Sequence, residues 1–183
     1  MESDFDTTTP GTWGEAARRI VHAIYLLFSS DAPPAAPAIG DIKNQFNNLY
    51  AFYQNNPGLP LYGHAALLGA NTLAAATNEF REHFPGEDEI VETLCRKQSD
   101  YGPENVVRFG EMGILVRLHD KIARLENLKM KAGALRPLNE TILDNWQDLI
   151  GYCAILAMFA AGEFTLPLTV AESNEGTLPI PQG

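Results

Sequence analysis

Residues 113–131 read GILVRLHDKIARLENLKMK, and this stretch decides the fold class. Its apolar side chains recur three or four residues apart, which is the spacing of one face of a helix. Residues 138–162 repeat this spacing and include the apolar run LIGYCAILAMFAA, which is too short to span a bilayer and is typical of a buried helix. No segment alternates with period two for long enough to indicate a sheet. The sequence therefore predicts an all-α protein, a bundle of helices.

Outward from this stretch, the same periodicity predicts helices over residues 13–30, 41–55, 62–84, 87–97, 113–131 and 138–162. Thr12 is a candidate cap for the first helix, and polar turns are expected at 98–105 and 133–137. Pro85-Gly86 marks a boundary. We expect a chain divided into a flexible arm, a helical N-terminal region without an assigned role, a helical core and a flexible tail, over residues 1–12, 13–85, 86–162 and 163–183.

The composition excludes several functional classes. The chain of 183 residues has a net charge of -10, so non-specific binding of duplex nucleic acid is not expected. The two cysteines, Cys95 and Cys153, lie in apolar helical patterns and predict buried free thiols in a reducing compartment. The acidic first ten residues do not resemble a signal peptide. We expect a cytoplasmic protein that does not enter membranes.

Two stripes of opposite charge follow the two long C-terminal helices. Arg117, Asp120, Lys121 and Arg124 share one face of the first helix, and Glu140, Asp144 and Asp148 share one face of the second. A short connection predicts that the two helices pack antiparallel. We therefore expect at least one of the three cations to lie within salt-bridge reach of Asp144 or Asp148.

The facing stripes have two interpretations that the pattern leaves open. They can form a structural ladder of salt bridges. They can instead form a site in which the carboxylates of Glu140, Asp144 and Asp148 hold Mg²⁺ and the basic side chains bind phosphate.

The polar segment KQSDYGPEN at 97–105 also has two interpretations. As an ordinary Gly-Pro turn it has no function of its own. As part of a binding site it brings together Lys97, Asp100, Tyr101 and Asn105, of which the tyrosine ring can stack on a base while the polar groups bind its edge.

These segments together resemble the nucleotide-modification-associated domain 1 family, which is common in bacteriophages and similar to the all-α nucleoside triphosphate pyrophosphatases of the MazG and dimeric dUTPase types. The resemblance covers residues 87–162, with KQSDYGPENVVRFGEMGILVRLHDKIARLENL at 97–128 and ETILDNWQDLIGYCAI at 140–155. The matching positions are Lys97, Asp100, Tyr101, Gly102, Asn105, Gly110, Gly113, Arg117, Asp120, Lys121, Arg124, Leu125, Leu128, Glu140, Asp144, Asp148, Leu149 and Tyr152.

The resemblance implies a MazG-like core, with extra N-terminal helices, that binds a nucleotide or deoxynucleotide in the host-cell cytoplasm. It implies Mg²⁺-dependent hydrolysis of a nucleoside triphosphate to the monophosphate and pyrophosphate. Asp120 would orient the attacking water, while Arg117, Lys121 and Arg124 would offset phosphate charge. The alternative is a non-catalytic module that binds or senses nucleotides for a partner protein. A homo-oligomer is also implied, and the apolar helix surface of 61–73 is our candidate interface.

Overall fold

The structure is a computed structural model that describes residues 9–30, 37–131 and 139–169. Every regular element in these residues is a helix, which confirms the predicted all-α class. The described part contains no helix that is long and apolar enough to cross a bilayer. The elements are α1 (Trp13–Ser30), α2 (Ile39–Asn55), α3 (Tyr62–Phe80), the 3₁₀ turn η1 (Arg81–His83), α4 (Glu87–Tyr101), α5 (Glu104–Val107), α6 (Gly110–Lys131) and α7 (Asn139–Ala160).

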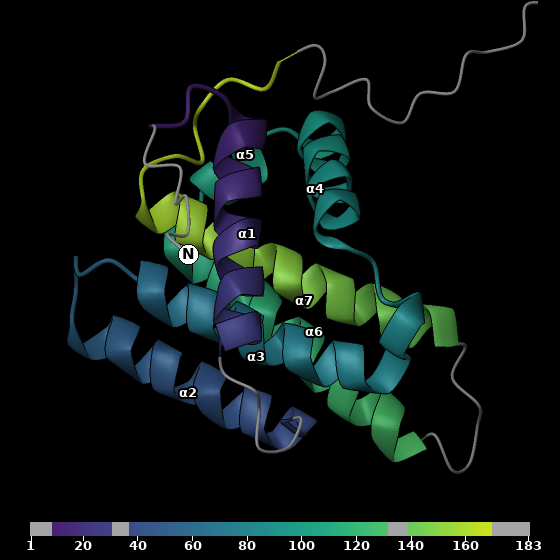
Figure 1. The fold of residues 1–183 in the computed structure, drawn as a ribbon. Coiled ribbons are helices and arrows are strands. Elements are labelled where there is room, and N and C mark those ends of the chain that lie inside the picture. Colours follow the sequence, from purple (N-terminus) through teal and green to yellow (C-terminus); the bar gives the residue numbers. More distant parts are fainter. Residues whose placement is uncertain (1–8, 31–36, 132–138, 170–183) are drawn as a thin grey trace, which may run out of the picture.

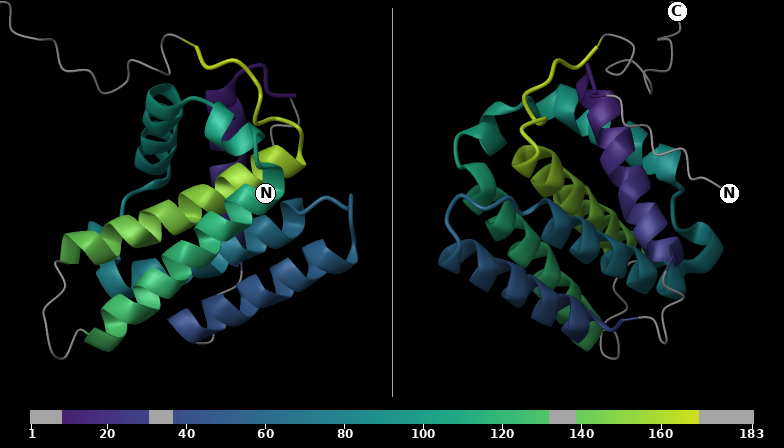
Figure 2. Two further views of the ribbon diagram at one scale, coloured as in Figure 1. Left: turned by 180° about the vertical axis from the view of Figure 1, so that it is seen from behind. Right: turned by 60° about the vertical axis from the view of Figure 1, so that its left-hand side comes forward.

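Helices α2, α3, α6 and α7 lie alongside one another and form the body of the bundle (Figures 1 and 2). In this group α7 packs against α3 and α6, and α2 packs against α3 and α6. Helix α1 crosses over α3 and α7 (Figure 1). Helix α4 lies beside α1 and contacts α7 much less than it contacts α1. The weak contact between α4 and α7 leaves room for a cavity between them.

The two sides of the predicted boundary at Pro85-Gly86 share one hydrophobic core. Ile20 and Leu68 come from the N-terminal region, and Ile114 and Leu149 come from the region after it; all four are almost fully buried in the same cluster. Each amphipathic helix has one apolar face that must be covered by another helix. The region 13–85, to which the sequence assigns no role, therefore provides the partners for α6 and α7.

Gly69 lies where α3 passes closest to its neighbours. A Cβ atom at this position would lie 2.8 Å from Cδ1 of Ile24 on α1 and 3.2 Å from Cβ of Cys153 on α7. Such distances are shorter than normal van der Waals contact, so a larger residue would push the helices apart. The missing side chain of Gly69 therefore sets the spacing of α1, α3 and α7.

The ends of several helices differ from the sequence prediction. Helix α4 continues through Tyr101 and ends at Gly102, whose φ is 65°, so the predicted turn over 98–105 is wrong for its first half. A glycine with positive φ is a common helix stop. The last helical residue, Tyr101, lies four residues after the predicted helix end at Lys97. Helix α6 begins at Gly110 rather than at Gly113. The predicted turn at 133–137 lies outside the described residues.

The N-terminus of α1 and the chain after α7 are fixed against each other. The Oγ1 of Thr12 accepts a hydrogen bond from the backbone N–H of Glu15, and the Glu15 carboxylate accepts one from the backbone N–H of Thr12, which confirms the predicted cap. The backbone N–H of Trp13 donates to the carbonyl of Pro167 at 2.9 Å, and Phe164 is buried against the Trp13 ring. Residues 163–169, which the sequence assigns to a flexible tail, thus pack on the core.

The apolar surface of 61–73 also differs from its expected role. Leu61, Ala65, Leu68 and Leu73 are buried inside the bundle, because α3 faces both α1 and α7. Only part of this segment, such as Leu67, remains exposed. The expected oligomer interface is therefore largely occupied by the core of the same chain.

Candidate functional site

One carboxylate, that of Asp148 on α7, binds two lysines from two other helices. Its Oδ2 accepts a hydrogen bond from Nζ of Lys121 on α6 at 2.7 Å, and its Oδ1 accepts one from Nζ of Lys97 on α4. This confirms the expectation that a cation of the basic stripe would reach the acidic stripe. It also joins Lys97, which the sequence places in a separate loop, to the same cluster.

The charge of Asp148 is stabilised by these contacts. Burial of the side chain opposes ionisation, but hydrogen bonds from Lys121 and Lys97 outweigh it, so the pKa of Asp148 lies below its usual value. The side chain is 21 % exposed, so the pair with Lys121 is shielded from solvent more than a typical surface ion pair. Asp148 is therefore an anion that holds two cations in place.

Arg117 and Tyr152 lie next to this cluster. The guanidinium carbon of Arg117 on α6 is 5.9 Å from the centre of the Tyr152 ring on α7, a cation–π distance. Tyr152 follows Asp148 by one helical turn, and Arg117 precedes Lys121 by one turn. From the Lys121–Asp148 pair to the Arg117–Tyr152 pair, the residue number falls along α6 and rises along α7, as expected for antiparallel helices.

A cavity of about 390 Å³ opens between α4 and α7, and its wall includes Lys97, Arg117, Asp148 and Tyr152. Small-molecule sites typically measure roughly 300–1,000 Å³. Its lining combines two cations, two carboxylates, tyrosine rings, amide side chains and apolar groups. The lining residues are Trp13, Pro85, Glu89, Ile90, Thr93, Leu94, Lys97, Gln98, Tyr101, Gly102, Val106, Arg117, Gln147, Asp148, Gly151, Tyr152 and Ile155.

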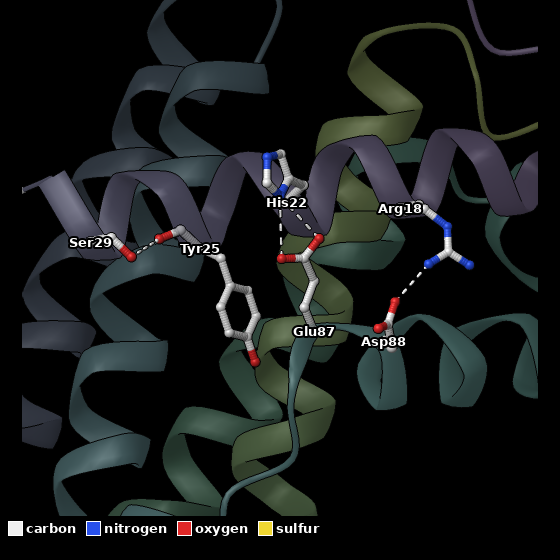
Figure 3. Close-up of polar contacts among 6 residues, drawn as sticks. All are labelled: Arg18, His22, Tyr25, Ser29, Glu87 and Asp88. Atoms are coloured by element: carbon white, nitrogen blue, oxygen red, sulfur yellow. Dashed lines mark hydrogen bonds and ion pairs between the residues drawn. The ribbon is translucent and has the colours of Figure 1, made fainter. Parts of the chain in front are cut away.

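Helix α4, one wall of this cavity, is held at its N-terminal end by α1 (Figure 3). Arg18 forms an ion pair with Asp88 at 2.7 Å, and Nδ1 of His22 lies 3.1 Å from the carboxylate of Glu87. The hydroxyl of Tyr25 donates to the carbonyl of Pro85 at 3.0 Å. At the opposite end of α4, Lys97 reaches Asp148. The wall is therefore anchored at both ends.

A second hollow of about 600 Å³ shares Arg117 and Tyr152 with the first cavity. Asp120 and Lys121 line it, together with the exposed Phe109 just before α6 and with Met112, Gly113 and the exposed Val116 in its first two turns. The predicted catalytic residues Asp120 and Lys121 thus face this second hollow, whereas Lys97 and Asp148 face the first cavity.

The structure brings together some of the predicted site residues and separates others. Lys97, Tyr101, Arg117 and Asp148 line the first cavity, and Lys121 is joined to them through its ion pair with Asp148. In contrast, the exposed side chains of Asp100, Arg124 and Asp144 are not among the lining residues of either cavity, and none of them forms an ion pair within the described residues. The side chains of Asn105 and Glu140 lie outside the described part of the structure.

Several lining residues were not on the predicted list. Tyr152 continues the stripe of Asp144 and Asp148 at a spacing of four residues, so the helical pattern contained a signal for it. Gln98 and Gln147 each lie next to a charged lining residue but carry no periodic signal of their own. Trp13 lies more than a hundred residues before Arg117 in the sequence, and no local pattern connects the two.

The predicted Mg²⁺ site is not assembled from the side chains that the structure describes. The described residues contain no group of three or more His, Cys, Asp and Glu side chains arranged to hold a metal ion. Both oxygens of Asp148 accept hydrogen bonds from lysines, and the Asp144 side chain is exposed. Magnesium binding by Glu140, Asp144 and Asp148 therefore stays a prediction.

Comparison with known proteins yields no relative for this chain. No protein-family model matches it, and neither does a curated protein or a solved structure. The resemblance to the phage nucleotide family thus stays a prediction, and the functional argument rests on the site itself.

Proposed function

We propose that this protein binds a nucleotide in the cavity between α4 and α7. The observation that carries the proposal is the placement of Lys97 and Arg117 on the wall of one cavity that also contains the tyrosine rings of Tyr101 and Tyr152. Cations supply charge-assisted hydrogen bonds to phosphate, and aromatic rings stack on bases. Each half of a nucleotide thus finds a suitable surface within the same cavity.

The cations around the cavity contrast with the negative charge of the whole chain. The protein carries a net charge of -10, yet Lys97 and Lys121 bind one carboxylate, that of Asp148, and Arg117 lies over the ring of Tyr152, one helical turn further along α7. Grouped cations repel one another unless an anion lies close by. Asp148 offsets only part of their charge, and Glu89, the other lining carboxylate, lies two turns before Lys97 on α4. An anionic ligand such as a phosphate group would therefore be attracted to the end of the cavity that contains Lys97 and Arg117.

Binding without catalysis is the form of the proposal that these contacts favour. Both oxygens of Asp148 accept hydrogen bonds from lysines, so a metal ion there would have to displace at least one of them. Mg²⁺-dependent hydrolysis, with Asp120 orienting water, is a separate proposal that rests on the family resemblance. Measuring pyrophosphate release from a panel of deoxynucleoside triphosphates with and without Mg²⁺ tests it directly.

Thermal unfolding in the presence of nucleotides tests the binding proposal. A ligand at a hundred times its Kd adds about 2.7 kcal/mol to the free energy of unfolding, which gives a clear rise in Tm. We expect such a rise with at least one nucleotide. If no ribo- or deoxynucleotide raises Tm at millimolar concentration, the proposal is wrong.

Two variants with matched controls locate the site. Lys97→Met removes a cation of the cavity, and Lys43→Met removes a lysine of nearly equal exposure (45 % against 46 %) that pairs with Glu126 on another part of the bundle. Arg117→Met is matched in the same way by Arg108→Met, since Arg108 lies 5.8 Å from the Phe109 ring. The cavity variants should lose about tenfold or more in nucleotide affinity, and the controls should keep it. Equal affinities in all four variants would place binding elsewhere.

A further inference from the structure

The charged end of the cavity has a definite charge balance. Lys97 and Lys121 share the carboxylate of Asp148, and Arg117 lies one turn from Lys121 on the same helix. Lys121 offsets the charge of Asp148 from the second hollow, so the charges of Lys97 and Arg117 remain at this end of the cavity, while Glu89 lines the same cavity two turns before Lys97. A phosphate monoester carries roughly 1.5 to 2 negative charges at pH 7. The cluster and a single phosphate group therefore nearly neutralise each other.

A longer phosphate chain would bring negative charge that the cavity does not offset. Each additional phosphate adds at least one charge, and the described lining residues provide no further cation besides Lys97 and Arg117. Metal ions commonly supply the missing charge in triphosphate sites. Here the carboxylate of Asp148, which belongs to the cluster, already accepts hydrogen bonds from two lysines.

Glu89 adds a second reason. It lies on α4 two turns before Lys97 and lines the same cavity. Eight residues of helix separate the two α-carbons by about 12 Å. At low ionic strength a charge interaction at this distance is only partly screened. The carboxylate of Glu89 would therefore oppose a chain of phosphates that extends along α4 away from Lys97.

From these observations we infer that the ligand of the cavity is a nucleoside monophosphate, bound without a divalent cation, with its phosphate at Lys97 and Arg117. This inference rests on the proposed nucleotide binding and narrows it to one class of ligand. The described contacts suit a protein that recognises the product of a nucleotide hydrolase, or the substrate of a nucleotide kinase, rather than a triphosphate.

Calorimetric titration of the unmodified protein tests the inference. The ligands are a nucleoside, its monophosphate and its triphosphate, together with inorganic phosphate, each measured at low ionic strength in EDTA and then in Mg²⁺. We expect the monophosphate to bind at least tenfold more tightly than each of the other three, and the order to be the same with Mg²⁺.

Each other outcome has its own meaning. A triphosphate that binds as tightly as the monophosphate, with or without Mg²⁺, overturns this inference and leaves nucleotide binding intact. Inorganic phosphate that binds as tightly as the monophosphate also overturns it, because the site would then select an anion alone. If none of the nucleotides binds, the proposed function fails, and the inference fails with it.

A pair of glutamate variants tests the contribution of α4. Glu89→Gln removes the charge that lines the cavity, whereas Glu92→Gln removes an exposed charge from the next turn of the same helix that is not among the lining residues. We expect Glu89→Gln to reduce the preference for monophosphate over triphosphate severalfold and Glu92→Gln to leave it unchanged. Equal preferences in both variants would show that Glu89 does not select the ligand.

Discussion

Nζ of Lys121 on α6 lies 2.7 Å from Oδ2 of Asp148 on α7, and Lys97 on α4 binds the other oxygen of the same carboxylate. One side chain thus connects three helices at the edge of the cavity. A second acidic residue behaves similarly elsewhere in the bundle: Glu79 on α3 pairs with Lys129 on α6 and accepts a hydrogen bond from the Trp146 indole on α7. Both carboxylates join helices that are distant in sequence.

Replacing Asp148 should therefore cost stability. Asp148→Ala leaves two lysines without their anion, and we expect the free energy of unfolding to fall by about 1–3 kcal/mol. Asp144→Ala is the control: its side chain is exposed and forms no ion pair within the described residues, so a change of less than about 0.5 kcal/mol is expected. Urea unfolding measures both values. A double-mutant cycle with Lys121→Met should give a coupling energy of at least about 0.5 kcal/mol; additive losses would mean that the pair contributes nothing.

Acidic pH should reduce the stability that the ionised carboxylate of Asp148 provides. The pKa of Asp148 is lower in the folded protein than its usual value of 3.8, because Lys121 and Lys97 donate to the charged form. The unfolded chain therefore takes up the proton first as the pH falls. The stabilisation by Asp148 is complete above the usual pKa, and it disappears as the pH falls through the pKa that Asp148 has in the folded protein. The difference in unfolding free energy between the native protein and Asp148→Asn should thus be smaller at about pH 3 than at about pH 6. A constant difference would contradict this assignment.

Alkaline pH should reduce the stability of the protein through the partly buried hydroxyl of Tyr25. Burial, and then the nearby charges of Glu87 and Glu89, raise its pKa to about 12 from the usual 10.0. The unfolded chain therefore loses the phenol proton first, and stability falls as the pH rises from the usual value toward the folded one. Tyr25→Phe cannot titrate, so its stability should fall less over this range, although it lacks the hydrogen bond to Pro85. Tyr50→Phe is a control, since it removes another partly buried tyrosine. Parallel stability curves for the native protein and Tyr25→Phe would contradict the prediction.

A glycine pair tests the packing of α3. Gly69→Ala places a methyl group 2.8 Å from Ile24 and 3.2 Å from Cys153, and we expect a loss of about 1–3 kcal/mol. Gly63→Ala lies on the same helix with no atom within 4 Å of the added carbon. It should be neutral or stabilising by up to about 1 kcal/mol, since alanine favours helix. Thermal unfolding distinguishes the two, and similar Tm values would mean that the three helices can separate at little cost.

The helices themselves could be predicted from the sequence because apolar side chains recur at helical spacing. The stripe through Ile114, Leu118 and Ile122 is buried along its whole length. Helix ends were predicted less well. The polar residues after Lys97 suggest a turn, but nothing in them forbids helix, and α4 continues until Gly102.

The site could be predicted only where it follows one helix or two neighbouring helices. The sequence predicts that some cation of the basic stripe reaches Asp144 or Asp148, because the two stripes lie on consecutive helices with a short connection, and the structure shows that the pair is Lys121 with Asp148. The participation of Trp13 and Glu89 was not, because their positions depend on how α1 and α4 pack on the bundle. That packing depends on contacts between distant parts of the chain, for which local periodicity carries no signal.

The central position of α7 has a consequence for the synthesis of the protein. Helices α1 and α3 bury apolar faces against α7, which is the last described helix to be made. Ribosomes add roughly 5–20 residues per second, so the 80 residues between the end of α3 and the end of α7 take about 4–16 s. During this interval the nascent chain exposes apolar surface with no native partner. Molecular chaperones that shield apolar surface would therefore be able to bind α1 and α3 during this interval, before α7 is made and packs against them.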